Sequence, residues 1–374
     1  MSPVRALARV NVAAIERNVA RLVREAEPTA VCAVVKADGY GHGAVPAARA
    51  ALAGGATWLA VATAEEARAL RDAGLRDPPV LVMGALSAEE LPVALEAGAD
   101  VVAWTPEFVA ALREAGRPVR VHVKLDTGMG RLGTRDPALA TALADEVAGD
   151  DDLVLAGAMT HFATADEPGD RFLGEQLERF RAWVQPLRGR HPGLVAHAAN
   201  SAATLREPAS RFDLVRCGIA IYGMDPFGED PAERDLEPAL ELTSYVAAVK
   251  ACEPGESAGY GRRFVAQRPT TLATVPIGYG DGWRRGLTND CDVLLHGRRV
   301  PLVGTVSMDN ITLEVEGKDA HVGDDVVLLG AQGAERVTAE EIARRLGTIN
   351  YEVTCGLSPR IPRVHHRDGE VLPG

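Results

Sequence analysis

Six basic side chains stand at or just beyond the ends of apolar runs, where together they could bind an anion and perform acid–base or covalent chemistry. They are Lys36, Lys124, Arg131, His161, His197 and Arg216. A histidine in such a place is more often structural than catalytic. A lysine at a buried strand end must lose its hydration, so it needs a partner, a lowered pKa or a covalent bond. Lys36, directly after AVCAVV, is therefore the first candidate for a reactive group.

Small residues near these basic groups favour a phosphate site. HAANSAAT places Asn200 and Ser201 at a helix start, where backbone N–H groups and a hydroxyl can bind an anion. Gly218, in RCGIAIYG, would let the backbone approach a phosphate closely, although tight packing is the alternative explanation. The glycines of KADGYGHG would turn Tyr40 toward the same phosphate. A phosphate site and a strand-end lysine together indicate pyridoxal phosphate, held as a Schiff base on Lys36.

The elements that must position these residues alternate between short apolar runs and stretches of helical period. Capping boxes such as Thr63-x-x-Glu66 mark the helix starts. Eight such repeats predict a (β/α)8 barrel, which carries its chemistry at the strand ends. A doubly wound open sheet fits less well, because no GxGxxG follows the first run. The runs cover residues 31–35, 58–62, 79–83, 100–103, 119–125, 153–159, 194–198 and 212–216.

The pattern changes after residue 235. Closely spaced runs such as TTLATVPIG and VPLVGTVSM, joined by Gly and Asp, predict a mostly-β domain with hairpins. One late helix is indicated by Thr338-x-x-Glu341. We therefore predict a barrel domain over residues 1–235 and a β domain over residues 236–374.

Composition narrows the function classes. The formal net charge of −12 argues against a nucleic-acid or anionic-membrane partner. We see no signal peptide and no apolar stretch approaching the roughly 18 residues of a membrane span. The five cysteines form no CxxC pair, which favours reduced thiols and a cytoplasmic protein. His122 and His161 have no carboxylate or second histidine at ligand spacing in the sequence, so no metal is expected.

Blocks along nearly the whole chain resemble the alanine racemase family. They are AVVKADGYGHG, VHVKLDTGMGRLG, HFATAD, HAANSAA, RCGIAIYG, AGYGR, GYGDG, SMDN and INYEVTCGLSPRIPR. The resemblance implies a barrel followed by a β domain, in which about the first ten residues form a strand of the β domain. It also implies interconversion of L-alanine and D-alanine with pyridoxal 5′-phosphate. In a bacterium, the D-alanine would supply peptidoglycan.

The resemblance also implies individual roles. Lys36 and Tyr260 would be the two bases, acting on opposite faces of the substrate, with Tyr260 donated by the partner subunit of a homodimer. Arg131 and His161 would support Tyr260. Arg216 would face the pyridine nitrogen of the cofactor, and the side chain that orients it would be His197.

Further matches concern the cofactor, the substrate and the entrance. Lys124 would be carbamylated, which would position Arg131 for the substrate. The expected cofactor contacts are Tyr40, Asn200, Ser201, Gly218, Ile219 and Tyr351. The expected substrate contacts, beside Arg131, are Met308 and Asp309. The expected entrance residues are Asp166, Tyr279 and Tyr351.

Two positions depart from the family pattern. Where the family commonly has Arg-x-Cys-Met-Asp, this chain reads TVSMD, with Thr305 and Ser307 in place of the arginine and the cysteine. Thr305 removes a charged side chain from the expected entrance, where Asp166 would otherwise have a partner. We expect altered salt dependence or substrate access rather than lost activity.

Other functions remain as alternatives. One is a racemase of the same fold that acts on serine or on other amino acids, and another is a decarboxylase of the same fold type. A non-enzymatic cofactor carrier of the single-barrel type is a third. The extra β domain argues against the carrier, and the AGYGR and SMDN blocks match racemases rather than decarboxylases.

Overall fold

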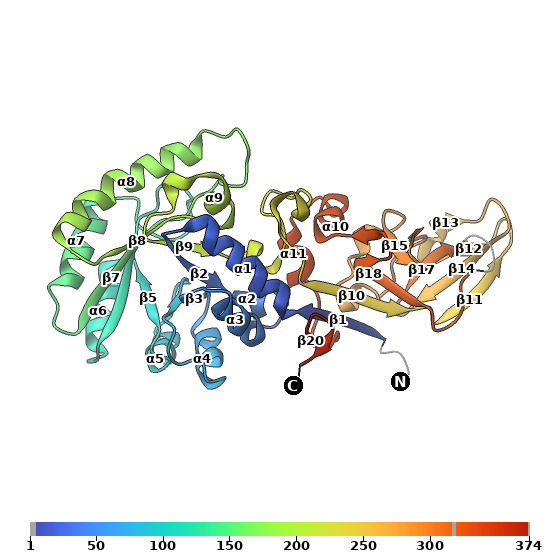
Figure 1. Ribbon diagram of the computed structural model, residues 1–374, viewed down its shortest axis with the longest axis horizontal. Coiled ribbons are helices and arrows are strands. Elements are labelled where there is room, and N and C mark those ends of the chain that lie inside the picture. Colours follow the sequence, from blue (N-terminus) through green and yellow to red (C-terminus); the bar gives the residue numbers. More distant parts are fainter. Residues whose placement is uncertain (1–4, 316–318, 373–374) are drawn as a thin grey trace. The chain divides into compact units, whose positions relative to one another are not determined.

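A computed structural model describes residues 5–315 and 319–372 of the chain (Figure 1). The chain divides into two compact units, Ile15–Ile221 and Met1–Ala14 with Tyr222–Gly374. Within the described residues, no helix combines the length and the apolarity that a membrane span requires.

The unit Ile15–Ile221 is built on an eight-stranded parallel sheet with the order β8-β7-β6-β5-β4-β3-β2-β9. The two end strands meet, because Asp213 N–H donates to Ala196 O at 3.0 Å and Arg216 N–H donates to Ala199 O at 2.9 Å. The sheet therefore closes as the predicted barrel. Each of the eight predicted runs overlaps one of its strands. These are β2 (Ala30–Val34), β3 (Trp58–Val61), β4 (Val80–Val82), β5 (Asp100–Ala103), β6 (Val119–Lys124), β7 (Leu153–Met159), β8 (Val195–His197) and β9 (Leu214–Cys217).

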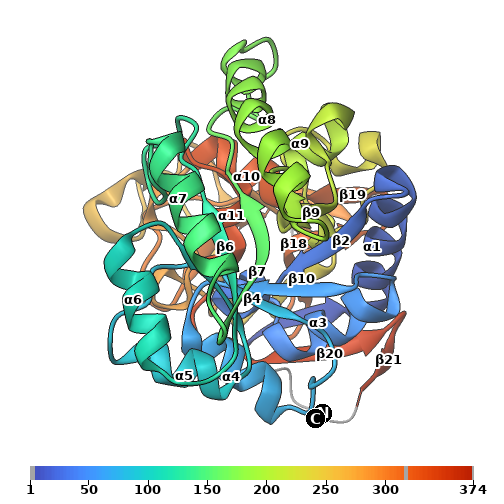
Figure 2. The same cartoon turned by 90° about the vertical axis from the view of Figure 1, so that its left-hand side faces the viewer.

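Helices surround the barrel strands (Figure 2). The predicted capping box is confirmed at α4, where Thr63 Oγ1 accepts from Glu66 N–H and the Glu66 carboxylate accepts from Thr63 N–H, both at 3.2 Å. Such caps satisfy backbone N–H groups that the first helical turn leaves without partners. The helices are α1 (Val12–Ala26), α2 (Lys36–Tyr40), α3 (Ala44–Ala53), α4 (Ala64–Asp72), α5 (Glu90–Glu96), α6 (Pro106–Glu114), α7 (Pro137–Ala148), α8 (Phe172–Arg190) and α9 (Ser201–Arg206).

The other unit is mostly β, as predicted. Its large sheet has the order β16-β15-β18-β10-β1-β20-β21, with β19 beside β18, and smaller sheets join β11-β14-β17 and β12-β13. β1 pairs antiparallel with β10 and parallel with β20, so the N-terminal strand lies inside this sheet. The strands are β1 (Ala6–Asn11), β10 (Leu240–Tyr245), β11 (Ala248–Cys252), β12 (Ser257–Ala258), β13 (Phe264–Val265), β14 (Thr270–Val275), β15 (Asp292–Leu295), β16 (Arg298–Pro301), β17 (Ile311–Val315), β18 (Asp325–Gln332), β19 (Glu335–Val337), β20 (Arg363–Arg367) and β21 (Glu370–Val371).

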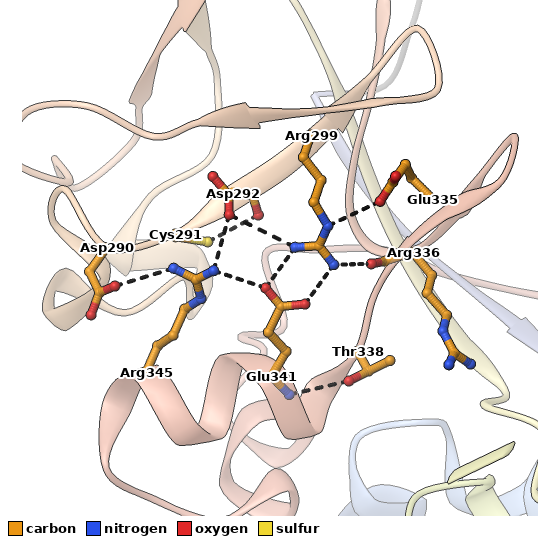
Figure 3. A network of polar contacts seen from close by, with 9 residues as sticks. All are labelled: Asp290, Cys291, Asp292, Arg299, Glu335, Arg336, Thr338, Glu341 and Arg345. Atoms are coloured by element: carbon orange, nitrogen blue, oxygen red, sulfur yellow. Dashed lines mark hydrogen bonds and ion pairs between the residues drawn. The ribbon is translucent and has the colours of Figure 1, made fainter. Parts of the chain in front are cut away.

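An ion-pair network ties the β15–β16 hairpin to α10 (Ala339–Leu346), whose predicted cap, Thr338, accepts from Glu341 N–H (Figure 3). Glu341 lies at the centre of the network. Its two carboxylate oxygens accept from Arg299 at 2.7 and 2.8 Å, and one of them also accepts from Arg345 at 3.1 Å. Burial alone would raise the pKa of Glu341, but the hydrogen bonds and charges of both arginines hold it below its usual value.

Glu341→Gln is expected to lower the free energy of unfolding by about 1 kcal/mol at neutral pH, because a charged acceptor of three hydrogen bonds is lost from a partly exposed site. The native pKa is depressed, so this contribution is present at neutral pH and disappears as the pH falls through the native pKa. Urea unfolding at several pH values measures it. Glu335→Gln, which removes one contact of Arg299 at a more exposed side chain, is the control and should cost less. A deficit for Glu341→Gln that persists undiminished in acid would contradict this account.

Candidate active site

Lys36 directly follows β2 and opens an unusual turn. Ala37, Asp38, Gly39 and Tyr40 all have positive φ, at 52°, 50°, 60° and 54°. The sequence predicted that glycines would make this turn, but three of these four residues carry side chains, each of which costs about 1–2 kcal/mol in a left-handed conformation. Backbone strain of this kind persists only where the surroundings fix it, and it is typical of functional sites.

Two carboxylates fix the left-handed turn. Ala37 N–H donates to Glu66 Oε1 at 2.6 Å, while Oε2 of the same side chain accepts from Ala62 N–H at 2.8 Å. Asp38 Oδ1 accepts from Ala44 N–H at 2.9 Å. Glu66 therefore serves both the cap of α4 and the segment that carries Lys36, and the sequence had indicated only the first of these roles.

The predicted phosphate residues converge in the barrel unit. Ser201 Oγ accepts from Gly218 N–H at 2.9 Å and from Ala220 N–H at 3.4 Å, which ties the start of α9 to the end of β9. A Cβ at Gly218 would lie 2.3 Å from Tyr40 Oη, so Gly218 and the Tyr40 phenol are already in close contact. Asn200 caps α9 by accepting from Ala203 N–H at 3.0 Å. These residues form a small polar cradle in which any larger residue at 218 would collide with Tyr40.

Arg216 is the central cation of the barrel unit, with only 3% of its surface exposed. It donates to Thr160 O at 2.8 Å, to Ala198 O at 3.0 Å and to His197 Nδ1 at 3.0 Å. It also lies 3.3 Å from His161 Nδ1. Burial lowers the pKa of Arg216 to about 10, so it stays protonated at neutral pH. Burial, and then the charge of Arg216, lower the pKa of His161 and of His197 well below the usual value, so both imidazoles are neutral.

Lys124 ends β6 and is 5% exposed. Burial, followed by the charges of Arg216 and Arg131, lowers its pKa to about 8, and Asp126 only partly opposes this. An appreciable fraction of Lys124 is therefore the neutral, nucleophilic amine at neutral pH. The charge of Lys36 also acts on Lys124, so the two predicted lysines lie within electrostatic reach of each other.

The loop that carries Arg131 is shaped by a buried carboxylate. Asp126 accepts from Gly128 N–H at 3.0 Å and from Gly130 N–H at 3.0 and 3.1 Å. Asp126 N–H donates in turn to Thr134 O at 2.8 Å, which closes the loop at its base. Arg131 itself is exposed. Its charge still lowers the pKa of Lys124, which places the two side chains in one electrostatic neighbourhood.

Gln176 of α8 is a supporting residue that the sequence did not reveal. Its side chain is fully buried; it accepts from Ala163 N–H at 2.8 Å and donates to His161 O at 3.2 Å and to Thr127 Oγ1 at 3.1 Å. These contacts fix the backbone that carries His161. A lone glutamine in an amphipathic helix has no sequence signal that distinguishes this role.

Tyr260 belongs to the other unit, where 73% of its surface is exposed. Its carbonyl accepts from Thr305 Oγ1 at 2.6 Å. Thr305 is only 5% exposed within this unit, where its hydroxyl is held by this contact with the backbone of Tyr260. A Cβ at Gly259 would lie 2.9 Å from Thr305 N, which shows how closely the two segments pack.

Two further predicted segments of this unit pack against each other. Tyr279 N–H donates to Ser307 O at 3.0 Å, and Gly280 N–H donates to Met308 O at 2.9 Å. A Cβ at Gly278 would lie 2.2 Å from Ser307 O, so GYGDG can approach SMDN only because it is glycine-rich. Asp309 pairs with Arg360 at 2.7 Å. This unit thus brings Tyr279, Met308 and Asp309 together.

The predicted site residues fall into two sets, each belonging to one unit. Asp166 is exposed in the loop after β7, and Tyr351 lies on α11 (Asn350–Cys355). The barrel unit carries Lys36, Tyr40, Lys124, Arg131, His161, Asp166, His197, Asn200, Ser201, Arg216, Gly218 and Ile219, and the other unit carries Tyr260, Tyr279, Met308, Asp309 and Tyr351.

Family models match both parts of the chain. The alanine racemase N-terminal domain matches residues 10–226, and the alanine racemase C-terminal domain matches residues 239–365. The chain belongs to the alanine racemase family. Curated alanine racemases of Symbiobacterium thermophilum and Frankia casuarinae are 43% and 44% identical to it, with 96% of each chain covered in both comparisons.

Solved structures of the alanine racemase family have the same fold. The alanine racemase from a D-cycloserine-producing Streptomyces lavendulae is 37% identical, with a TM-score of 0.92 over 100% of this chain and 98% of that one. The enzyme from E. faecalis is 38% identical, with a TM-score of 0.90 over 96% of this chain and 98% of that one. The predicted family and fold class are thereby confirmed.

Proposed function

We propose that this chain interconverts L-alanine and D-alanine with pyridoxal phosphate, using Lys36 and Tyr260 as its two acid–base groups. The observation that carries this proposal is the convergence of a strand-end lysine, a phosphate cradle and a buried cluster of basic side chains in one barrel of an alanine racemase family member. The relatives named above are alanine racemases, and the chain matches them over nearly its full length.

The polar cradle fits the cofactor. The Ser201 hydroxyl, the backbone near Gly218 and the Tyr40 phenol would hold the phosphate, and Arg216 would face the ring nitrogen. When bound, pyridoxal phosphate supplies the electron sink that makes the α-proton of an amino acid removable. Arg216 has no acceptor and stays protonated, so it would donate to the ring nitrogen rather than leave it to be protonated. A guanidinium beside the ring nitrogen would make the cofactor a weaker electron sink. This would favour return of the proton to the substrate carbon over side reactions.

Racemisation requires one proton acceptor on each face of the substrate carbon. Lys36 Nζ would serve the D-face and Tyr260 Oη the L-face. A phenol acts as a proton acceptor more readily when positive charge lies close to its oxygen. Arg131 would supply such charge and bind the substrate carboxylate, together with the backbone at Met308.

We place the enzyme in the cytoplasm as a homodimer in which Tyr260 of the partner subunit completes the site. None of the five cysteines forms a disulfide in the described part of the chain, as is usual in a reducing compartment. Splitting the dimer should abolish turnover while each barrel keeps its cofactor. A fully active monomer would contradict the shared site.

A substrate panel tests the function. The purified protein is incubated with L-alanine, L-serine, L-lysine and L-glutamate, and each D-enantiomer is quantified, with cofactor absorbance recorded before and after borohydride. Dominant formation of D-alanine supports the proposal. Preference for another amino acid would favour the racemase of different specificity, and no D-enantiomer with any substrate would overturn the function.

Lys124 is expected to carry a carbamate. Its neutral Nζ attacks carbon dioxide, an N–C bond forms and one proton leaves. The positive charge of Lys124, which would repel Arg131, is thereby replaced with a carboxylate. The lowered pKa of about 8 favours this reaction. Protein equilibrated with 13C-bicarbonate should show a carbamate carbon signal by NMR that Lys124→Met lacks and Lys250→Met retains. If the wild-type protein showed no such signal, Lys124 would be an unmodified amine.

Thr305→Val is expected to lower kcat/KM about fivefold, the equivalent of one lost hydrogen bond of about 1 kcal/mol. The valine cannot donate to the Tyr260 carbonyl, so the segment carrying Tyr260 loses an anchor. Thr305→Ser keeps the hydroxyl and should stay near the wild-type value. Steady-state kinetics of the three proteins measures this difference, and equal losses in both variants would show that the hydroxyl bond to Tyr260 is not what matters.

A further inference from the structure

Four buried polar side chains cross the interior of the barrel, where layers of branched apolar side chains are usual. Asp100 begins β5, His122 lies in β6, His197 ends β8 and Arg216 lies in β9. Their exposed fractions are 3%, 0%, 0% and 3%. Burying such groups is costly unless each polar atom finds a partner.

The four side chains form one continuous hydrogen-bonded chain. Asp100 Oδ2 is 3.1 Å from His122 Nε2, and His122 Nδ1 is 2.8 Å from His197 Nε2. His197 Nδ1 is 3.0 Å from Arg216 Nη1. Both ring nitrogens of each histidine are thus engaged.

The two ends of this hydrogen-bonded chain fix the position of every proton. A guanidinium only donates, so His197 Nδ1 must accept, and a neutral His197 then carries its proton on Nε2. His122 Nδ1 accepts that proton, which leaves the proton of His122 on Nε2, directed at the Asp100 carboxylate. Both histidines are neutral, since burial lowers their pKa values despite the opposing effect of Asp100 on His122.

The barrel is shaped to hold the His122 ring. A Cβ at Gly157 would lie 2.2 Å from His122 Nδ1 and 2.7 Å from its Cε1, so only glycine fits there. The β6–β7 register also shifts between Val121 and His122, which pair with Leu155 and Gly157. This local irregularity is an independent sign that β7 adapts to the ring.

The far end of the hydrogen-bonded chain is held by a second cation. Arg120 Nε lies 3.1 and 3.2 Å from the two Asp100 oxygens, and its own side chain is about half exposed at 48%. Both carboxylate oxygens of Asp100 therefore accept hydrogen bonds, and Arg120 holds this end of the hydrogen-bonded chain in place.

We propose that Asp100 and His122 are positioning residues that hold the Arg216 guanidinium through His197, by locking both histidines as Nε2–H tautomers. The inference rests on the proposed function, in which Arg216 faces the ring nitrogen of the cofactor. Without an acceptor on His122, the Nε2–H of His197 has no partner in the barrel interior, so its ring can turn and release Arg216. The effect should fall on kcat, because in the proposed function these side chains act on the cofactor through Arg216 rather than on alanine.

The tautomers provide a readout that does not depend on activity. Full-length protein with 15N-labelled histidine, with and without pyridoxal phosphate, should show His122 and His197 as Nε2–H tautomers, with assignments made from single histidine substitutions. Asp100→Asn keeps an acceptor oxygen and should preserve this pattern, whereas His122→Phe should change the His197 signals. An Nδ1–H tautomer at either residue of the wild-type protein would overturn the proposal even if the enzyme racemises alanine.

Kinetics and cofactor absorbance complete the test. His122→Phe and Asp100→Ala should lower kcat about 10- to 100-fold with little change in KM, as expected when a binding group is misplaced by a fraction of an ångström. Both should also shift the cofactor absorption spectrum, and Asp100→Asn should stay within about threefold of wild type in kcat. His191→Phe, which removes a histidine–aspartate contact elsewhere in the barrel unit, is the matched control and should leave kcat and spectrum unchanged.

The outcomes separate the two proposals. Wild-type tautomers as expected, without alanine racemisation, would leave the hydrogen-bonded chain intact and refute the function. A folded His122→Phe protein with wild-type kcat and spectrum would refute the positioning role. Equal losses in Asp100→Asn and Asp100→Ala would show that the acceptor oxygen is not what matters, and would also refute it.

Discussion

Replacing Lys36 with alanine is expected to lower kcat for alanine racemisation by about 10²- to 10⁴-fold, the range that a lost acid–base group produces. Lys36 combines two roles in the proposed function, since its Nζ would bind the cofactor covalently and accept the D-face proton. The turn behind it is held by backbone contacts to Glu66 and Asp38, so removing the side chain should leave the fold intact. Formation of D-alanine from L-alanine, followed by chiral chromatography, measures the loss.

The control is Lys250→Ala, which removes an exposed lysine of β11. It should retain wild-type kcat, and borohydride should still attach the cofactor to Lys36, as peptide mapping would show. Lys36→Ala should give no such adduct at any lysine. If Lys36→Ala kept more than a tenth of the wild-type kcat, or if the adduct formed at Lys124 instead, the assignment of the reactive lysine would be wrong.

The barrel strands could be predicted from the sequence because they are buried on both faces. Each therefore appears as a short, largely apolar run, and the runs at 100–103 and 153–159 match β5 and β7 to the residue. The chemistry of a barrel lies at its strand ends, so the positions of Lys36, Lys124, His197 and Arg216 in the sequence were enough to single them out.

The supporting groups could not be predicted, because their partners come from distant parts of the chain. Asp100 and His122 sit inside runs that the sequence indicates only as strands, and their contact depends on how β5 and β6 are registered. The contact of Gln176 with the His161 backbone likewise joins a helix to a loop. The sequence indicated Glu66 as part of a helix cap. Its bond to the Ala37 N–H could not be predicted, because it depends on how two segments distant in the sequence fold together.

The backbone strain after Lys36 could not be predicted from the sequence, for a different reason. The glycines of KADGYGHG predicted a turn, yet Ala37, Asp38 and Tyr40 also adopt positive φ. Residue type predicts such conformations only for glycine and, less strongly, for asparagine and aspartate. The bond from the Thr305 hydroxyl to the Tyr260 carbonyl could not be predicted either, because residue type does not show which backbone group a hydroxyl will meet.

Tyr260→Phe is expected to lower kcat for racemisation in both directions by about 10³-fold, while proton transfer on the D-face continues. Lys36 would still remove and return the D-face proton, so D-alanine should exchange its α-hydrogen with deuterium oxide without becoming L-alanine. L-Alanine should lose this exchange, because the L-face has no other acceptor. Proton NMR of each enantiomer, incubated separately in deuterium oxide, measures both rates.

The pattern across variants distinguishes a base from a structural residue. Lys36→Ala should abolish exchange for D-alanine, and Tyr260→Phe should abolish it for L-alanine, whereas a residue that only shapes the site would affect both enantiomers equally. Tyr245→Phe is the matched control, because Tyr245 is a half-buried tyrosine of the same unit that is not among the predicted site residues. It should keep exchange with both enantiomers. Equal loss for D- and L-alanine in Tyr260→Phe would mean that this phenol organises the site and that the L-face proton moves to another group.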